Sequence, residues 1–153
     1  MFIRNVVDAL TQAGISYALV GGYAVNLHGA VRGTVDIDIV IALDQGSYEK
    51  CEGAMKSIGL TPRLPVTASE VFHFRDEYIN RRNLTAWSFH NLNNPLEVVD
   101  VLITEDAKAL KTVEKRAFGI KLIVASIDEL IAMKKRTGRA QDIEDIKALE
   151  KIR

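Results

Sequence analysis

Apolar positions recur along the chain with two periods, and together they predict alternating helices and strands. Between Phe2 and Leu10 the spacing is helical, and Gly14 ends the helix. The run from Ser16 to Val20 is short and continuous, as in a buried strand. Further helices are predicted over residues 23–28, 45–58, 69–82, 105–111, 127–136 and 139–152, and further strands over residues 34–43, 83–91, 96–104 and 113–125. Because at least one hairpin interrupts the alternation, we expect an α/β (α+β) fold with a mixed β-sheet flanked by helices.

Polar residues and prolines mark several boundaries of these elements. Thr104 is placed to cap the helix over residues 105–111. Ser126, followed three residues later by Glu129, forms the capping-box pattern that opens the helix over residues 127–136. Two of the three prolines fall within residues 61–69, and this segment is therefore predicted to be a loop.

Length and composition indicate one globular domain, residues 1–153, with a C-terminal helical segment at about residues 126–153. Lys and Arg total 20 and Asp and Glu total 20, so net charge neither requires nor excludes a nucleic-acid partner. The single Cys51 cannot form an intrachain disulfide, and we expect it to be a buried, inert thiol. No signal-peptide pattern and no membrane-length apolar run is present, so we expect a cytoplasmic protein without membrane contact.

Two aspartates interrupt the apolar strand predicted over residues 34–43. Asp36 and Asp38 share one face, roughly 6–7 Å apart, while Val35, Ile37, Ile39 and Ile41 share the other. At an effective dielectric near 20 the two carboxylates repel each other by about 2–3 kcal/mol, which a divalent cation would reverse. An amphipathic edge strand with a solvated face is the alternative. Val40 and Ala42 lie on the aspartate side, and they indicate that this face is covered and favour a metal.

A third carboxylate comes from the predicted strand over residues 96–104. Asp100 lies there between Val99 and Val101, where a lone charge has no packing role. It either pairs with a nearby Arg or completes a metal site. Three aspartates on two strands suit a pair of Mg²⁺ ions, with Mn²⁺ as the alternative, arranged for in-line displacement at phosphorus.

Gly21 and Gly22 lie where a predicted strand runs into a short helix. Glycines allow a ligand to approach the backbone closely, and a helix N-terminus attracts anions. The sequence contains neither a Walker loop nor a GxGxxG fingerprint, and a double glycine by itself is often only a tight turn.

The glycine pair, thirteen intervening residues, an Asp-apolar-Asp-apolar run and a later strand aspartate together resemble the signature of the nucleotidyltransferase superfamily, which shares the catalytic core of DNA polymerase beta. The stretch "HGAVRGTVDIDI" looks like the version in small bacterial members, namely minimal nucleotidyltransferases and abortive-infection type toxins. The segment "AMKKRTGRAQDIEDIKAL" is similar to a lysine-arginine-aspartate helical segment of those toxins. Residues 46–96 match no motif of the superfamily.

The resemblance implies an enzyme that moves a nucleoside monophosphate from a nucleoside triphosphate (NTP) to an acceptor hydroxyl. Asp36, Asp38 and Asp100 would bind the two metals, and Asp100 would also help to draw the proton from the acceptor. The implied nucleotide or phosphate contacts are Gly21, Gly22, Arg32, Thr34, Lys134 and Arg139. For Arg32 a surface turn, and for Lys134 and Arg139 a solvated helix end, are the alternatives. His28 is expected to cap or pack, and Asp142 and Asp145 to pair with basic residues rather than with metal.

The acceptor and partners stay open at this point. RNA such as tRNA, a protein or a small molecule would each suit the chemistry, and a cognate antitoxin is one candidate partner. Substrate choice would lie with residues 61–69, with Arg81 and Arg82, or with a second protein. A toxin that acts on RNA would use the same chemistry, and a tRNA end would suit the basic cluster formed by Lys134, Lys135, Arg136 and Arg139 with Arg81 and Arg82, although a few basic residues on helices are usually only surface. Strongly salt-dependent RNA binding would favour this alternative, and its absence would favour a small-molecule or protein acceptor.

Two other functions compete with the transferase. A phosphatase of the haloacid-dehalogenase kind also carries an Asp-x-Asp pair, but there a loop follows the pair, whereas here the strand continues. A non-catalytic module that binds a nucleotide or a partner on the same fold is disfavoured by the intact Asp36, Asp38 and Asp100.

Overall fold

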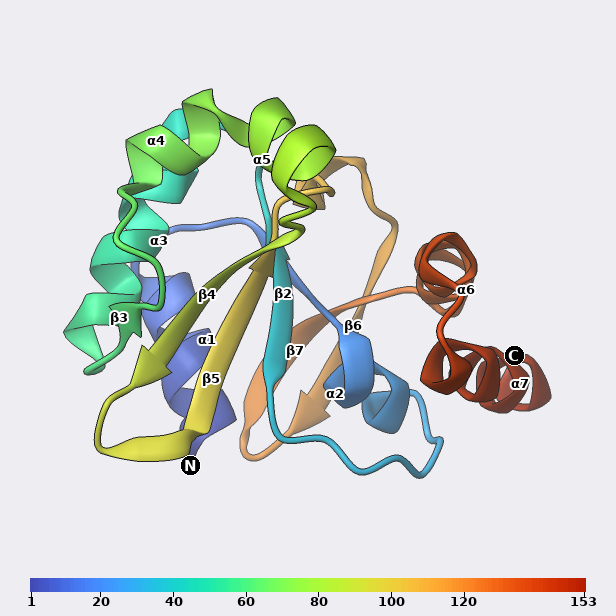
Figure 1. Ribbon diagram of the computed structural model, residues 1–153. Helices are drawn as coiled ribbons and strands as arrows, with labels where there is room; N and C mark the ends of the chain where they lie inside the picture. Colours follow the sequence, from blue (N-terminus) through green and yellow to red (C-terminus); the bar gives the residue numbers. More distant parts are fainter.

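The computed structural model describes residues 1–153 and contains a seven-stranded mixed sheet flanked by helices (Figure 1). The strand order is β3-β4-β5-β2-β1-β7-β6, with β1–β7 and β2–β5 parallel and the other neighbours antiparallel. The strands are β1 (Tyr17–Val20), β2 (Ile37–Ile41), β3 (Thr61–Pro62), β4 (Ala86–Asn91), β5 (Asn94–Leu102), β6 (Thr112–Ala117) and β7 (Ile120–Ala125). The predicted fold class is confirmed.

Helices cover both faces of this sheet, α1 and α3 on one side and α2 on the other, toward α6 and α7 (Figure 1). They are α1 (Phe2–Gln12), α2 (Gly21–Leu27), α3 (Gln45–Ser57), α4 (Ala68–His73), α5 (Arg75–Arg82), α6 (Ile127–Thr137) and α7 (Ala140–Ile152), with a 3₁₀ turn at Ala107–Ala109. None of them combines the length and apolar character needed to cross a bilayer.

The face of the sheet that carries Ile37 and Ile39 forms most of the core against α3. Trp87 on β4 lies opposite Val101, and its ring stacks on Tyr48 of α3 with centroids 5.6 Å apart. Cys51 is buried in the same layer, and burial raises the pKa of its thiol to about 12, as expected for an inert cysteine. This packing holds one face of β2 and β5 against α3 and leaves their opposite face for polar side chains.

β2 is shorter than its apolar pattern predicts. The strand begins at Ile37 instead of Thr34, so Val35 is exposed and Asp36 precedes the strand. β1 ends opposite Asp38, where the chain turns into α2, so residues before β2 have no partner on that side. The prediction that Val35 shares the apolar face of this strand with Ile37, Ile39 and Ile41 is therefore wrong, because Val35 lies outside both the strand and the core.

Three other boundaries differ from the pattern. The predicted helix over residues 69–82 is split at Phe74 into α4, which buries Ala68 and Val71, and α5, which packs Tyr78 and Ile79 against the core but has no fully buried residue. The predicted helix over residues 105–111 is only a 3₁₀ turn, and Asp106 instead of Thr104 caps it. Residues 61–69 include the short edge strand β3, where a proline is tolerated.

Candidate active site

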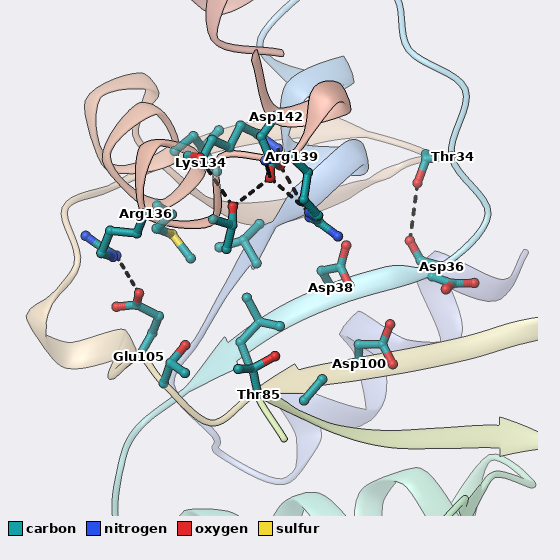
Figure 2. Close-up of a pocket in the computed structure, with 18 of the residues that line it drawn as sticks. Thr34, Asp36, Asp38, Thr85, Asp100, Glu105, Lys134, Arg136, Arg139 and Asp142 are labelled. Carbon is teal, nitrogen blue, oxygen red and sulfur yellow. Dashed lines mark hydrogen bonds and ion pairs between the residues drawn. The ribbon is translucent and has the colours of Figure 1, made fainter. Parts of the chain in front are cut away.

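The register of three neighbouring strands brings the predicted site together. Asp38 on β2 lies beside Asp100 on β5 in the parallel ladder and opposite Val20, the last residue of β1. Paired positions on adjacent strands point to the same face, so both carboxylates project from the face opposite α3, next to the start of α2. Figure 2 shows Asp38 and Asp100 close to each other, with Asp36 below Thr34, just before the chain enters β2.

Gly21 and Gly22 lie where neighbouring side chains leave no room for a Cβ atom. Gly21 has φ +65°, and a Cβ atom there would lie 2.0 Å from Asp38 Oδ2. A Cβ atom on Gly22 would lie 2.0 Å from Arg32 Nη1 and 2.6 Å from Thr34 Oγ1. The first glycine thus admits the Asp38 carboxylate, and the second admits the loop that carries Arg32 and Thr34.

The pKa values of two of these carboxyl groups, Asp38 and Asp36, lie above their ordinary value. Burial and then the charges of Asp100 and Asp36 raise the pKa of Asp38 to about 7, although Lys134 opposes the shift. Burial and the charge of Asp100 also raise the pKa of Asp36, against the effect of Arg63. The strand face therefore concentrates negative charge that a cation would stabilise.

These residues offer only hard oxygen donors, which suit Mg²⁺. No three His, Cys, Asp or Glu side chains are grouped closely enough to hold one ion among them. Mg²⁺ is commonly held by one or two carboxylates together with substrate phosphates, and the Asp38–Asp100 pair would supply two such carboxylates. The chemistry of these donors therefore fits the metal that the resemblance implies.

Sequence reasoning missed Ser88. It lies opposite Asp100 in the β4–β5 ladder, and its hydroxyl donates a hydrogen bond of 2.5 Å to Asp100 Oδ1. No arginine forms an ion pair with Asp100, so the alternative of an Arg partner is wrong. The hydroxyl of Ser88 orients the carboxylate instead. The alternation of apolar and polar residues at Trp87, Ser88 and Phe89 indicates that Ser88 lies on the polar face of its strand, but only the hairpin register shows that it faces Asp100.

Three predicted cations, Arg32, Lys134 and Arg139, form a cationic wall opposite the strand aspartates, each beside a buried aspartate of α7. Arg32 Nε lies 3.0 Å from Asp145 Oδ1. Arg139 Nε donates to Asp142 Oδ2 at 2.9 Å, and Lys134 Nζ donates to Asp145 Oδ2 at 2.8 Å. The prediction that Asp142 and Asp145 pair with basic residues is confirmed. Lys134 is buried, so the alternative of a solvated helix end is wrong for this residue.

Hydrogen bonds keep the buried Asp142 of this wall ionised. Burial would raise the pKa of Asp142, but hydrogen bonds from Arg139 and Thr137 outweigh it and lower the pKa to about 2. The backbone N–H of Arg139 donates to the same carboxylate at 3.1 Å. Asp142 therefore stays ionised and holds Arg139 at the start of α7.

A cleft of about 1330 Å³ connects the two walls (Figure 2). Every predicted site residue except Gly22 lines it, and Gly22 is buried beneath Arg32 and Thr34. Those that line it are Gly21, Arg32, Thr34, Asp36, Asp38, Asp100, Lys134 and Arg139. His28 lies outside the lining and contacts the Ala125 carbonyl at 2.8 Å, in keeping with its expected packing role.

The far end of the cleft has a different character. Near Glu105 and Arg136 (Figure 2) its walls carry apolar and hydroxyl side chains, namely Thr85, Ala86, Leu102, Thr104, Leu130 and Met133. The two charged residues there, Arg136 and Glu105, form an ion pair of 2.5 Å. One end of the cleft is thus rich in free oxygen donors and cations, and the other is nearly charge-neutral.

No protein-family model matches the sequence, and neither does any curated protein. Solved structures do resemble the fold. The antibiotic-resistance factor ANT(2'')-Ia aligns over 97% of this chain and 80% of its own, with 11% identity and a TM-score of 0.67. The lincosamide antibiotic adenylyltransferase LnuA, bound to lincomycin, aligns over 99% and 96%, with 15% identity and a TM-score of 0.64.

A third structure extends this agreement to another source. An antigenic nucleotidyltransferase-like protein from Paracoccidioides brasiliensis aligns over 96% of this chain and 73% of its own, with 17% identity and a TM-score of 0.59. At such low identities the likeness concerns the arrangement of helices and strands. On that ground the chain has the fold of the nucleotidyltransferase superfamily.

Proposed function

We propose that this chain transfers a nucleoside monophosphate from an NTP to an acceptor hydroxyl. The observation that carries the proposal is the side-by-side placement of Asp38 and Asp100 at the floor of the cleft. The acceptor oxygen forms a bond to the α-phosphorus, the bond from that phosphorus to the bridging oxygen of the β-phosphate breaks, and pyrophosphate leaves. The name of LnuA as an adenylyltransferase supports this reaction class for a chain with the same fold.

Asp38 and Asp100, with Asp36 beside them, would hold Mg²⁺ or Mn²⁺ in this account. The resemblance implies two such ions. They would neutralise phosphate charge and lower the pKa of the acceptor hydroxyl. Asp100 is oriented by Ser88 and accepts the hydroxyl proton. Asp38 holds its carboxylate against Gly21, where only a glycine leaves room for it.

The phosphates of the donor would lie against the cationic wall. Arg32, Lys134 and Arg139 line the cleft together with the aspartates, and Gly21 and Thr34 line the same cleft. Gly22 supports the site indirectly, because its missing side chain lets Arg32 approach the start of α2.

For the acceptor we propose a hydroxylated small molecule of low net charge. The far end of the cleft offers apolar and threonine side chains, and its only charges, Glu105 and Arg136, neutralise each other. RNA is the competing acceptor, because Lys134 of the expected basic cluster is buried but Lys135, Arg136 and Arg139 are exposed. Lincomycin, which LnuA binds, is a suitable first member of a test panel.

The test is transfer from an α-³²P-labelled NTP with Mg²⁺, using lincomycin, other hydroxylated antibiotics and tRNA as acceptors. We expect labelled product with at least one small molecule, and none with the Asp38→Asn variant. Label on tRNA alone would contradict the acceptor class and leave the transferase intact. No label on any acceptor, together with no NTP binding, would contradict the proposed function itself.

A further inference from the structure

Asp145 lies behind the cationic wall and does not line the cleft itself. The residue is 2% exposed and contacts basic groups from two separate elements. Its Oδ2 accepts from Lys134 Nζ of α6 at 2.8 Å, and its Oδ1 lies 3.0 Å from Arg32 Nε of the loop before β2. Gln141 Nε2 donates to Oδ1 at 2.9 Å. One carboxylate on α7 thus joins α6, α7 and the loop that leads to the aspartate strand.

Stability alone does not account for this arrangement. A buried ion pair is often no more stable than apolar residues of similar volume, because desolvation offsets the attraction. Here one carboxylate holds two cations, and both of those cations line the cleft. Asp145 therefore reduces the repulsion between Arg32 and Lys134 and keeps both side chains at the cleft wall.

The contact with Arg32 leaves that guanidinium available to a ligand. Although Nε lies 3.0 Å from Asp145 Oδ1, the N–H is not aligned for a hydrogen bond. Nη1 makes only a long bond of 3.4 Å to the Gly33 carbonyl. The guanidinium is thus held through charge along its Nε edge, and its terminal nitrogens retain donors for a phosphate.

We propose that Asp145 is a positioning residue that aligns Arg32 and Lys134 to receive the phosphates of the donor nucleotide. This inference rests on the proposed function. It assigns to a buried residue of α7 the role of linking the C-terminal helices to the nucleotide end of the cleft. Asp142 binds Arg139 in the same manner, but unlike Asp145 it lines the cleft itself.

Calorimetry on a double-mutant cycle tests the proposal. The titrant is whichever of ATP, GTP, CTP and UTP binds the wild type with Mg²⁺, and the variants are Asp145→Asn, Arg32→Ala and their combination. Glu144→Gln, on the exposed face of the same helix, is the matched control. We expect Asp145→Asn to raise Kd about 10-fold, as for loss of a charged hydrogen-bonding partner, and Glu144→Gln to leave it unchanged.

The combination decides how Asp145 acts. If Asp145 acts through Arg32, the Kd of the double variant exceeds the Kd of Arg32→Ala by less than about threefold. Fully multiplicative losses would overturn positioning through Arg32, and an unchanged Kd in Asp145→Asn would overturn the positioning role as a whole, while the transferase proposal stands in both cases. If the wild type binds no NTP at all, the proposed function fails, and the positioning role fails with it.

A second measurement needs no variant of Asp145. In ¹⁵N spectra of the wild type, the Nε–H signal of Arg32 is identified by its loss in Arg32→Lys. We expect this proton to exchange with water more slowly than that of the exposed Arg153. Equal exchange rates would show that Asp145 does not hold Arg32, and would overturn the proposal even if Asp145→Asn fails to fold.

Discussion

Asp38 and Asp100 face each other across two parallel strands, and no basic side chain forms an ion pair with either. Nearby cations are present, but Asp142 and Asp145 hold them on the opposite wall. The strand carboxylates are thereby left free to bind a ligand, and so are the outward-facing donors of Arg32 and Arg139. Separation of charge across the cleft is the feature from which the proposed function follows.

Gly21→Ala tests the close approach between α2 and β2. The new Cβ would lie 2.0 Å from Asp38 Oδ2 in a backbone with φ +65°, so we expect destabilisation of about 1–3 kcal/mol and displacement of Asp38. Thermal melts and NTP titration measure the two effects. Gly53→Ala in α3 is the control, since nothing lies within 4 Å of its Cβ and helix propensity predicts a gain of up to about 1 kcal/mol. Equal stability of the two variants would contradict this role for Gly21.

Asp38 makes the stability of the metal-free protein depend on pH. Its pKa of about 7 is above the ordinary value of 3.8, so folding favours the protonated form. The contribution is present in full below pH 4 and is lost as the pH rises through 7. Asp38→Asn should therefore stabilise the protein at pH 8 by about 1–3 kcal/mol and have little effect at pH 4, as followed by thermal melts. A stabilisation of the same size at both pH values would argue against a shifted carboxyl.

Ser88→Ala tests the orientation of Asp100. Removing the hydroxyl leaves Asp100 Oδ1 without its 2.5 Å donor, so we expect the transfer rate to fall about 10-fold, with a stability loss of about 1 kcal/mol. Ser88→Thr keeps the donor and should retain most of the activity. If Ser88→Ala is as active as the wild type, Asp100 needs no support from β4.

Much of this arrangement could be predicted from local patterns. A strand that ends at a double glycine, a short helix and an aspartate-bearing strand are consecutive in the chain, so their residues indicate both the elements and the chemistry. Val40 and Ala42 correctly indicated that the aspartate face is covered further along, because both are buried. These signals depend on period-2 alternation, which a sequence displays directly.

What could not be predicted depends on contacts between distant elements. Ser88 meets Asp100 through hairpin register, and Arg32 meets Asp145 across more than a hundred residues. β2 begins only at Ile37 because the neighbouring strand β1 ends at Val20 and the chain turns into α2 at Gly21, not because of the residues of β2. Such features need the sheet order, which no local period specifies.

The most direct test of the account is isothermal titration of ATP, GTP, CTP and UTP into the protein with and without Mg²⁺, beside an Asp38→Asn/Asp100→Asn variant. We expect at least one NTP to bind the wild type only with Mg²⁺, and the double variant to lose that binding while it remains folded. Binding of equal strength in the variant would contradict a metal–nucleotide site at this carboxylate pair. Absence of NTP binding by the wild type under both conditions would contradict the proposed function.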